Sequence, residues 1–337
     1  GNWHTRNCIS RTPFGLISML RHWIWRSLPI VSVNGVSAVP ASRFRLPPKQ
    51  PTARLTPERA VPASLAMLLK RILTVAVLLP LFIGGLFYLP GDWWAIALLP
   101  MVMAGAWEWA NLAGFKLVSR GLYVLLLLVS AIAILSVHGL EQLFLIDRAV
   151  FAASAVFWLL LAPLWLKFGW KIRSPVLMAV TGWVLLMPTW LALARLQERP
   201  WLLLALMGIV WVADSAAYFA GHQWGRRKLA PSVSPGKTWE GVAGAAIAVA
   251  VYHALVWNFG FGPHAPGLAF AAAALVAILF PLSIIGDLFE SWIKRQAGVK
   301  DSGRLLPGHG GVLDRIDALT STLPLAALIV AGLLQQG

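Results

Sequence analysis

Residues 267–285 read GLAFAAAALVAILFPLSII and carry no charge, whereas residues 291–317 read SWIKRQAGVKDSGRLLPGHGGVLDRID and are rich in Lys, Arg, Asp and Gly. An apolar helix of about 20 residues crosses the hydrocarbon core of a bilayer. Charged groups at the centre of such a helix cost about 2.5 to 3.5 kcal/mol each, so a membrane chain that gathers them usually uses them. The two segments together predict a membrane-spanning helix with a functional site at its end.

The apolar pattern recurs along most of the chain. Hydrophobic residues make up 58% of the chain and charged residues 12%, which is outside the usual balance of a soluble domain. Apolar windows of spanning length lie near residues 72–90, 93–114, 121–138, 149–166, 175–195, 201–221, 241–260, 267–285 and 315–334. We therefore predict an all-α fold, that of a polytopic integral membrane protein with about nine transmembrane helices.

The N-terminal part of the chain differs in composition from the rest. It contains nine Lys and Arg residues against a single acid, Glu58, and no apolar run of spanning length. We interpret residues 1–66 as a basic, Pro-rich extension that is a disordered tail or an over-extended start, with a surface-lying arm or a targeting peptide as alternatives. Residues 67–337 are then the transmembrane catalytic domain.

The distribution of Lys and Arg predicts the orientation of the spans. If the first span starts in the cytoplasm, sixteen of the nineteen basic residues beyond the extension fall on the cytoplasmic side, and only Arg148, Arg195 and Arg199 fall outside. We expect a bacterial inner-membrane protein whose polar loops, 222–240 and 286–314, face the cytoplasm. Because the basic residues occupy short loops rather than one basic face, the net charge of +15 does not indicate a nucleic-acid partner.

An acidic residue, Asp214, ends the apolar run 202–213. On a helix, Asp214, Tyr218 and Gly221 lie at i, i+4 and i+7 and share one face. The carboxylate is either a buried structural acid or a ligand for metal or substrate. We favour the ligand, with Tyr218 as a substrate contact, because residue types that bind phosphate follow directly.

Those residues form the segment GRRKLAPSVSPGKTWEG, 225–241. Its PGKT resembles the end of a P-loop, but the motif G-x4-G-K-[ST] requires glycine where this chain has Pro231, so a P-loop ATPase is excluded. Cationic and hydroxyl side chains can still hold phosphates. The candidates for this role are Ser232, Ser234, Lys237 and Thr238, whereas Arg226, Arg227 and Lys228 equally suit anchoring at the cytoplasmic surface.

A second polar array begins at Asp287. Asp287, Glu290 or Ser291, and Lys294 share one helical face, and Arg295 follows. An ordinary amphipathic surface helix has the same pattern. The position directly after an apolar span, and the continuation into Lys300 and Asp301, favour a catalytic site.

A glycine-rich loop, PGHGG, precedes the last span. Glycines let backbone N–H groups approach a ligand closely, so Gly310 and Gly311 are candidate substrate contacts. Asp314 and Asp317 then share one helical face, with Arg315 beside them. Such a pair of carboxylates can hold one Mg²⁺ ion or two cations with oxygen ligands.

Two polar residues keep two interpretations each. His309, between the loop glycines, is either a hydrogen-bonding loop residue or a group that contacts phosphate or transfers protons. Glu108, inside the second span, either pairs with a neighbouring helix or borders the lipid headgroup site.

The polar segments together resemble a known family, the phosphatidate cytidylyltransferases or CDP-diacylglycerol synthases. Residues 291–317 match at every position the family pattern Ser-x-apolar-Lys-Arg-x4-Lys-Asp-x-small-x2-apolar-Pro-x-His-Gly-Gly-apolar-x-Asp-Arg-x-Asp. Residues 214–218 match Asp-x-x-Ala-Tyr, and residues 234–241 match Ser-Pro-x-Lys-Thr-Trp-x-Gly. The resemblance covers residues 67–337 and is sharpest from Asp214 to Asp317.

The resemblance implies an enzyme of phospholipid biosynthesis that joins CTP to phosphatidic acid, giving CDP-diacylglycerol and pyrophosphate. Such phosphoryl transfer needs positioning and charge neutralisation more than a special nucleophile. The implied ligands of Mg²⁺ are among Asp214, Asp287, Asp314 and Asp317. The implied catalytic residues are Asp287, Lys294, Arg295, Lys300, Asp301, His309 and Arg315.

Two other classes fit the sequence less well. A transporter or flippase for a phosphorylated lipid or small anion is expected to hold its charges at the membrane midplane and to show an internal repeat, but here the charges gather at one boundary. A CDP-alcohol phosphatidyltransferase needs an Asp-Gly-x2-Ala-Arg core, and the chain has no Asp-Gly pair. The expected partners are CTP, phosphatidic acid and membrane lipids. Gly- and Ala-rich residues 241–250 and 271–274 allow close helix packing, within one monomer or in a homodimer.

Overall fold

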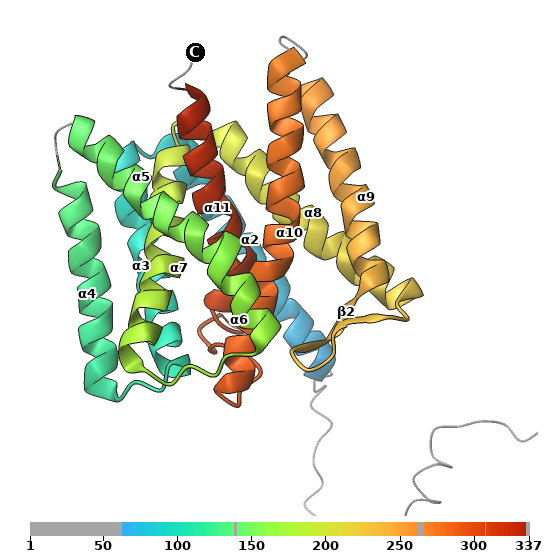
Figure 1. Ribbon diagram of the computed structural model, residues 1–337, viewed down its shortest axis with the longest axis horizontal. Coiled ribbons are helices and arrows are strands. Elements are labelled where there is room, and N and C mark those ends of the chain that lie inside the picture. The colour runs from blue at the N-terminus through green and yellow to red at the C-terminus, as the bar shows by residue number, and fades with distance from the viewer. Residues whose placement is uncertain (1–62, 138–139, 262–265, 307, 335–337) are drawn as a thin grey trace, which may run out of the picture. The chain divides into compact units, whose positions relative to one another are not determined.

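The computed structural model describes residues 63–137, 140–261, 266–306 and 308–334. They belong to a single unit, residues 61–337. Of the predicted extension, residues 1–66, residues 1–62 lie outside the described part of the chain, and residues 63–66 begin the first helix. Nine helices among the described residues are long and apolar enough to cross a membrane. This confirms the predicted all-α polytopic fold (Figure 1).

Each predicted apolar window corresponds to a helix or to a pair of helices joined by a π-helical turn. The elements are α2 (Ala63–Tyr88), α3 (Gly91–Leu112), α4 (Leu117–Leu135), α5 (Leu140–Val156), η2 (Phe157–Leu161), α6 (Ala162–Phe168), α7 (Pro175–Leu196), α8 (Pro200–Trp224), β1 (Lys228–Ala230), β2 (Ser234–Thr238), α9 (Trp239–Val256), η3 (Trp257–Phe261), α10 (Pro266–Gln296) and α11 (Leu313–Leu334).

One boundary differs from the prediction. The span predicted at 267–285 extends to residue 296, because the helical face predicted from Asp287 to Lys294 continues α10 without a break instead of belonging to the loop 286–314. Phe289 and Ile293 of this segment are almost completely buried, at 0% and 1% exposure. Because they lie four residues apart, they form an apolar stripe that keeps the polar end of the helix packed on the protein.

The polar loop after α8 contains the one sheet found in the described residues. Strands β1 and β2 form a short antiparallel hairpin, with Ala230 opposite Ser234. The Val233 N–H donates to the Ala230 carbonyl at 3.1 Å and closes the turn. Thr238 ends the hairpin and caps α9, since its Oγ1 accepts the Gly241 N–H at 3.1 Å.

Small residues bring the helices of the C-terminal half close together. A Cβ at Gly244 of α9 would clash with Ala220 of α8, and a Cβ at Gly241 would lie 2.8 Å from the Ala217 carbonyl oxygen. A Cβ at Gly286 of α10 would lie 2.5 Å from the Ser321 hydroxyl of α11. These small residues allow close packing of helices within one chain. For Gly241 and Gly244, in the segment 241–250, this is one of the two roles expected from the sequence.

Candidate functional site

The two polar arrays of the sequence meet at one end of the helices. The hairpin, the last turns of α10 and the start of α11 lie together at the lower end of the view in Figure 1. α8 packs along α9, and α10 packs along α11 and also contacts α8 and β2. Residues that are about 50 to 100 positions apart in the chain thereby form one charged region.

An ion pair joins the two arrays directly. Lys237 Nζ in β2 lies 2.5 Å from Asp287 Oδ2 in α10, and their side chains are 24% and 29% exposed. Ser291 donates from its hydroxyl to the other oxygen, Asp287 Oδ1, at 3.4 Å. Both members of the pair are predicted site residues, and the partial exposure leaves them within reach of a ligand.

Two further acids surround this pair. Asp214 on α8 interacts electrostatically with Asp287, Lys237 and Arg315. Asp317, one turn into α11, interacts with Asp287, Glu290 and Asp214. In the described part of the chain, no hydrogen bond or ion pair involves the Asp214 carboxylate, and the only one to the Asp317 carboxylate comes from the Ala318 backbone N–H at 2.8 Å.

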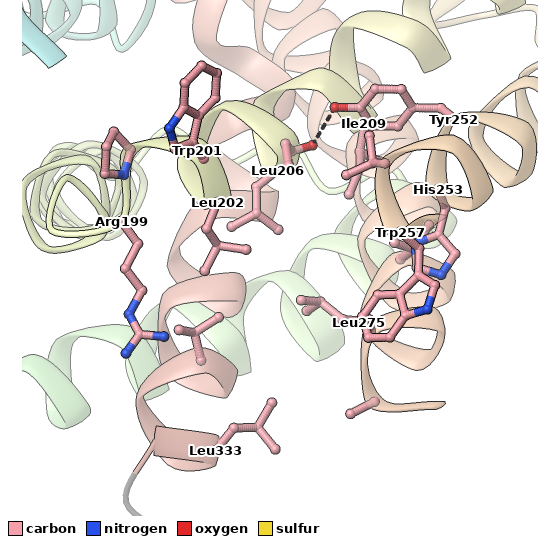
Figure 2. A pocket seen from close by; sticks show the side chains of 17 residues that line it. Arg199, Trp201, Leu202, Leu206, Ile209, Tyr252, His253, Trp257, Leu275 and Leu333 are labelled. Atoms are coloured by element: carbon pink, nitrogen blue, oxygen red, sulfur yellow. Dashed lines mark hydrogen bonds between the residues drawn. The ribbon is translucent and has the colours of Figure 1, made fainter. Parts of the chain in front are cut away.

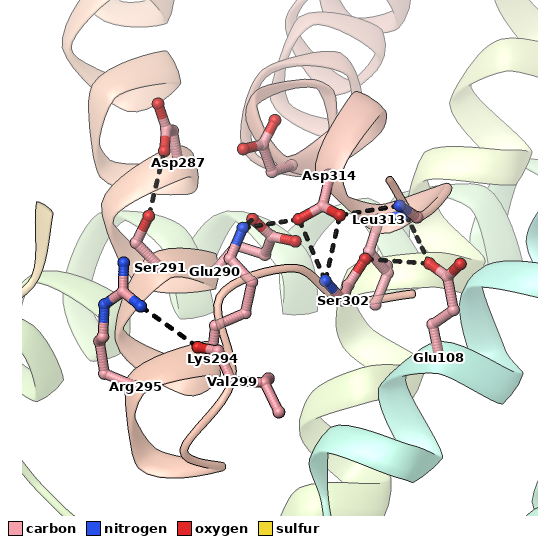
Figure 3. A network of polar contacts seen from close by, with 12 residues as sticks. Glu108, Asp287, Glu290, Ser291, Lys294, Arg295, Val299, Ser302, Leu313 and Asp314 are labelled. Atoms are coloured by element: carbon pink, nitrogen blue, oxygen red, sulfur yellow. Dashed lines mark hydrogen bonds and ion pairs between the residues drawn. The ribbon is translucent and has the colours of Figure 1, made fainter. Parts of the chain in front are cut away.

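Lys294 is held between two carboxylates rather than left free. Its Nζ lies 2.5 Å from Glu290 Oε2 and 2.7 Å from Asp314 Oδ1, as Figure 3 shows. The three side chains are 11%, 5% and 7% exposed. The sequence allows either Glu290 or Ser291 to share a helical face with Asp287 and Lys294. In the structure, Glu290 makes the close contact to Lys294.

Asp314 organises the glycine-rich loop. Its Oδ2 accepts the backbone N–H groups of Ser302 at 3.0 Å and Gly311 at 2.8 Å, while Oδ1 contacts Lys294. The carboxylate therefore links α11 to α10 and to both ends of the segment 302–311. The sequence places Asp314 among the candidate metal ligands, but in this arrangement most of its hydrogen-bonding capacity is used by protein donors.

Glu108 supports the same loop from α3. Its carboxylate accepts the Ser302 hydroxyl at 3.1 Å, the Val312 N–H at 3.1 Å and the Leu313 N–H at 3.0 Å, and the residue is only 5% exposed. A Cβ on Gly303 would clash with this carboxylate, and one on Gly311 would lie 2.5 Å from it. Of its two interpretations, Glu108 fits pairing with a neighbouring helix, and Figure 3 places it beside Ser302 and Leu313.

Arg295 contacts backbone rather than acids. Its Nε donates to the Val233 carbonyl at 3.3 Å, and a terminal nitrogen donates to the Val299 carbonyl at 3.2 Å. It thus joins the hairpin turn to the end of α10. Ser232, at that turn, is exposed and Ser234 is half-buried, so both hydroxyls lie near the surface of the charged region.

The remaining predicted residues lie around this core of contacts. Tyr218, Lys300, Asp301 and Arg315 are exposed, and the described residues give no hydrogen bond or ion pair to the side chains of Lys300 and Asp301. His309 has a buried Nδ1 atom without a hydrogen-bond partner in the described chain. Gly310, at φ +85°, has a left-handed conformation that favours glycine.

One contributor was not expected from the sequence. Arg71, at the start of the first span, donates from Nε to the Gly308 carbonyl at 2.9 Å. It is the second of two adjacent basic residues, which the sequence explains equally well as a topological signal. Only the fold places it on the glycine-rich loop.

The charge balance of the region suits a divalent cation. The groups that interact with one another are five acids, Asp214, Asp287, Glu290, Asp314 and Asp317, and three cations, Lys237, Lys294 and Arg315. When all are ionised, two negative charges are in excess. Clustered carboxylates either take up protons or bind a cation that relieves their repulsion.

The geometry also limits how a metal could bind. Within the described ranges, no three His, Cys, Asp or Glu side chains converge closely enough to hold an ion. Mg²⁺ commonly takes one or two carboxylates and completes its shell with substrate phosphates and water. The donor set therefore fits a Mg²⁺ ion that arrives with, or is shared by, a phosphate ligand.

Comparison with known proteins gives a consistent result. A family model described as the cytidylyltransferase family matches residues 69–333. A protein of Pseudomonas aeruginosa named phosphatidate cytidylyltransferase is 43% identical over 274 residues, which cover 78% of this chain and 97% of that protein. A protein of the same name from Haemophilus influenzae is 36% identical over 296 residues, which cover 77% of this chain and 96% of that protein. One from Thermotoga maritima is 42% identical over 136 residues, covering 37% and 47%.

Proposed function

The chain belongs to the cytidylyltransferase family, and from this membership and the site we infer that it is a phosphatidate cytidylyltransferase. It transfers the cytidylyl group of CTP to phosphatidic acid, and it releases pyrophosphate. The observation that carries this function is the Lys237–Asp287 ion pair. This ion pair joins the hairpin, whose residue types suit phosphate binding, to the acidic C-terminal part of α10 at one end of the helices.

We propose that the lipid substrate approaches along the side of α8. A cleft of about 780 Å³ runs between α2 and α8, lined by Leu79, Ile83, Trp211, Ser215 and other mostly apolar residues. Ser215, in the lining, is the residue after Asp214 on α8, so the cleft reaches the same turn of the helix as this acid, although the two side chains lie on different faces. A diacyl substrate can keep its chains in apolar surroundings there while its phosphate reaches the charged region.

We propose that the lipid phosphate attacks the α-phosphorus of CTP in line. One of its oxygens forms the new P–O bond, the bond to the β-phosphate oxygen breaks, and pyrophosphate leaves with the electron pair. No general base is needed, because the attacking phosphate is already an anion. Lys237 exchanges its contact with Asp287 for a phosphate oxygen, and Arg295, Lys300 and Arg315 neutralise the pyrophosphate.

One or two of Asp214, Asp287 and Asp317 are the proposed ligands for Mg²⁺, with substrate phosphates and water completing its shell, and a second cation could share this group of acids. The ion supplies charge neutralisation across the phosphates when it is bound. Asp314 adds negative charge at the edge of this group while it holds Lys294 and the loop. Ser232, Ser234, Tyr218, Gly310 and Gly311 are the proposed substrate contacts, and Asp301 and His309 remain proposed catalytic residues.

We propose that this end of the bundle faces the cytoplasm of a bacterial cell, with the protein in the inner membrane. CTP is charged and cannot cross the bilayer, so the site must lie on the side where the nucleotide is. The bias of Lys and Arg toward the same side supports this orientation.

The direct test is a transfer assay with the purified full-length chain. We expect labelled CTP, phosphatidic acid and Mg²⁺ to give a lipid-soluble cytidine product together with pyrophosphate in equal amount. Phosphatidylcholine in place of phosphatidic acid is the control, since it offers no terminal phosphate. Folded protein that forms no product, or that only moves intact lipid between leaflets, would contradict the proposed function.

A further inference from the structure

Three arginines depart from the charge bias of the chain, and the fold brings them to one place. Arg148, Arg195 and Arg199 all line a cavity of about 420 Å³ formed by the ends of α5, α7 and α11. On the predicted orientation they would be the only basic residues after residue 66 outside the cytoplasm. Because the three arginines converge on one cavity, we infer that they have a local role there and do not serve to orient the protein in the membrane.

Two of these arginines have no partner within the described structure. Arg195 is paired with Asp147, at 2.8 Å from Nε to Oδ2 and 3.3 Å from its second nitrogen to Oδ1. No hydrogen bond or ion pair in the described residues involves the guanidinium groups of Arg148 and Arg199. With Glu198 as the second acid of the lining, the cavity keeps one positive charge in excess.

A second cavity adjoins the first at Arg199. It has a volume of about 470 Å³ between α8, α9, α10 and α11, and its lining is apolar apart from Arg199, Tyr252, His253 and the indoles of Trp201 and Trp257. Arg199 and Val330 line both cavities. Figure 2 shows Arg199 on one side of the second cavity, with Leu275 and Trp257 across from it.

Both cavities lie far from the charged region described above. Ala272, in the second cavity, precedes Asp287 by fifteen positions on α10, and Val330 follows Asp314 by sixteen on α11. At about 1.5 Å per residue these separations are about 22 to 24 Å along the helices. In a hydrocarbon core about 30 Å thick, the cavities lie in the opposite leaflet.

We propose that the two cavities bind an anionic diacyl phospholipid of the leaflet opposite the catalytic site. One acyl chain occupies the second cavity and the other the apolar part of the first, which Phe144, Phe151 and Leu328 line. The phosphate lies between them at Arg199, with Arg148 as a second contact. Apolar walls accept the chains, and guanidinium groups without carboxylate partners bind phosphate in a planar, bidentate manner. Tyr252 also lines the cleft between α2 and α8, but none of the charged residues of the two cavities belongs to the catalytic site, so the proposal can be tested separately from the proposed reaction.

Native mass spectrometry of the full chain in detergent tests the site. We expect phosphatidylglycerol to be retained at one copy per chain more tightly than phosphatidylcholine of the same acyl chains. Arg199→Gln should weaken this retention about tenfold, and Ala272→Phe, which fills the second cavity, should abolish it. Arg173→Gln changes an exposed arginine of the α6–α7 connection and serves as the matched control.

The competing explanations give different results. Lys237→Gln should leave the retained phosphatidylglycerol in place, and if it removes the lipid instead, the lipid was bound at the catalytic site. Equal retention of both lipids, or wild-type retention by folded Arg199→Gln, would overturn the proposal. The proposal would also be overturned if the protein were a dimer without bound lipid and Ala272→Phe converted it to monomers. That result would mean that a second copy of the chain covers the cavities.

Discussion

Glu108 of α3 accepts the backbone N–H of Leu313, the first residue of α11, at 3.0 Å, although the two residues are 205 positions apart. The first N–H groups of a helix have no partner within the helix. Glu108 therefore caps α11 from another helix and places a carboxylate at the positive end of the α11 dipole. Since Asp314 is in the same first turn of α11 and Asp317 lies one turn further, this contact helps to set the direction in which both acids project.

Glu108→Gln should weaken both stability and turnover. The amide keeps one acceptor oxygen but turns an N–H₂ group toward donors, so at least one buried hydrogen bond to a carboxylate is lost, at a cost of about 1 to 3 kcal/mol. We expect a lower melting temperature and a kcat reduced about tenfold, with the KM for CTP little changed. Glu198→Gln, at an exposed acid without an ion pair in the described residues, is the control. A variant with wild-type kcat and melting temperature would show that the cap is dispensable.

Lys237 and Asp287 should behave as one unit in catalysis. Lys237→Gln and Asp287→Asn each remove a charge from the ion pair, and we expect each to lower kcat/KM by about a hundredfold or more. The double variant should lose much less than the product of the two effects, because the residues share an interaction. Lys228→Gln, on the same hairpin but exposed, should retain activity. Fully multiplicative losses would mean that the two groups act separately.

Asp314 and Asp317 should differ in what they support. Asp314→Asn disturbs the contacts to Lys294, Ser302 and Gly311, so we expect loss of both thermal stability and activity. Asp317→Asn removes a charge that repels neighbouring acids, so the protein should fold with unchanged or higher stability while activity falls by orders of magnitude. A Mg²⁺ titration of both variants checks the metal assignment. Near-wild-type turnover of Asp317→Asn at all Mg²⁺ concentrations would remove it from the ligand set.

Gly311→Ala should distort the glycine-rich loop, because the added methyl group has no room beside Glu108. The added Cβ would lie 2.5 Å from a Glu108 oxygen and 2.7 Å from the Gly303 backbone nitrogen, so the loop must move away from the α11 cap. We expect a loss of about 1 to 3 kcal/mol in stability and a large loss of activity. Gly236→Ala, whose Cβ meets nothing within 4 Å, is the control in the melting and transfer assays. Equal behaviour of the two variants would contradict the close packing of Glu108 against this loop.

Cysteine labelling tests the proposed orientation. Replacement of Cys8 removes the only native thiol, after which Ser232→Cys and Glu198→Cys place exposed thiols at opposite ends of the helices. A membrane-impermeant thiol reagent added to cells with a permeabilised outer envelope should label Glu198→Cys. Ser232→Cys should react only after the inner membrane is opened. The reverse order would separate the site from cytoplasmic CTP.

The sequence by itself determined the fold class and the composition of the site. Hydropathy is a local, additive property, so nine apolar windows were enough to predict nine spans. The spacing of the segment 291–317 was enough to identify the family. Even the helical face from Asp287 to Lys294 followed from the 3.6-residue period, because that period holds whatever surrounds the helix.

Which charged residues form ion pairs depends on how the helices pack, and the sequence alone does not show it. The sequence presents Lys237, Asp287, Lys294 and Asp314 as equivalent candidates, but α10 and α11 approach at Gly286 and place Lys294 between two acids. The role of Glu108 depends on contacts to residues about 200 positions away, which no local pattern encodes. The reason is physical: hydropathy and helical period are properties of each segment alone, whereas an ion pair or a helix cap exists only where packing brings two segments within about 3 Å.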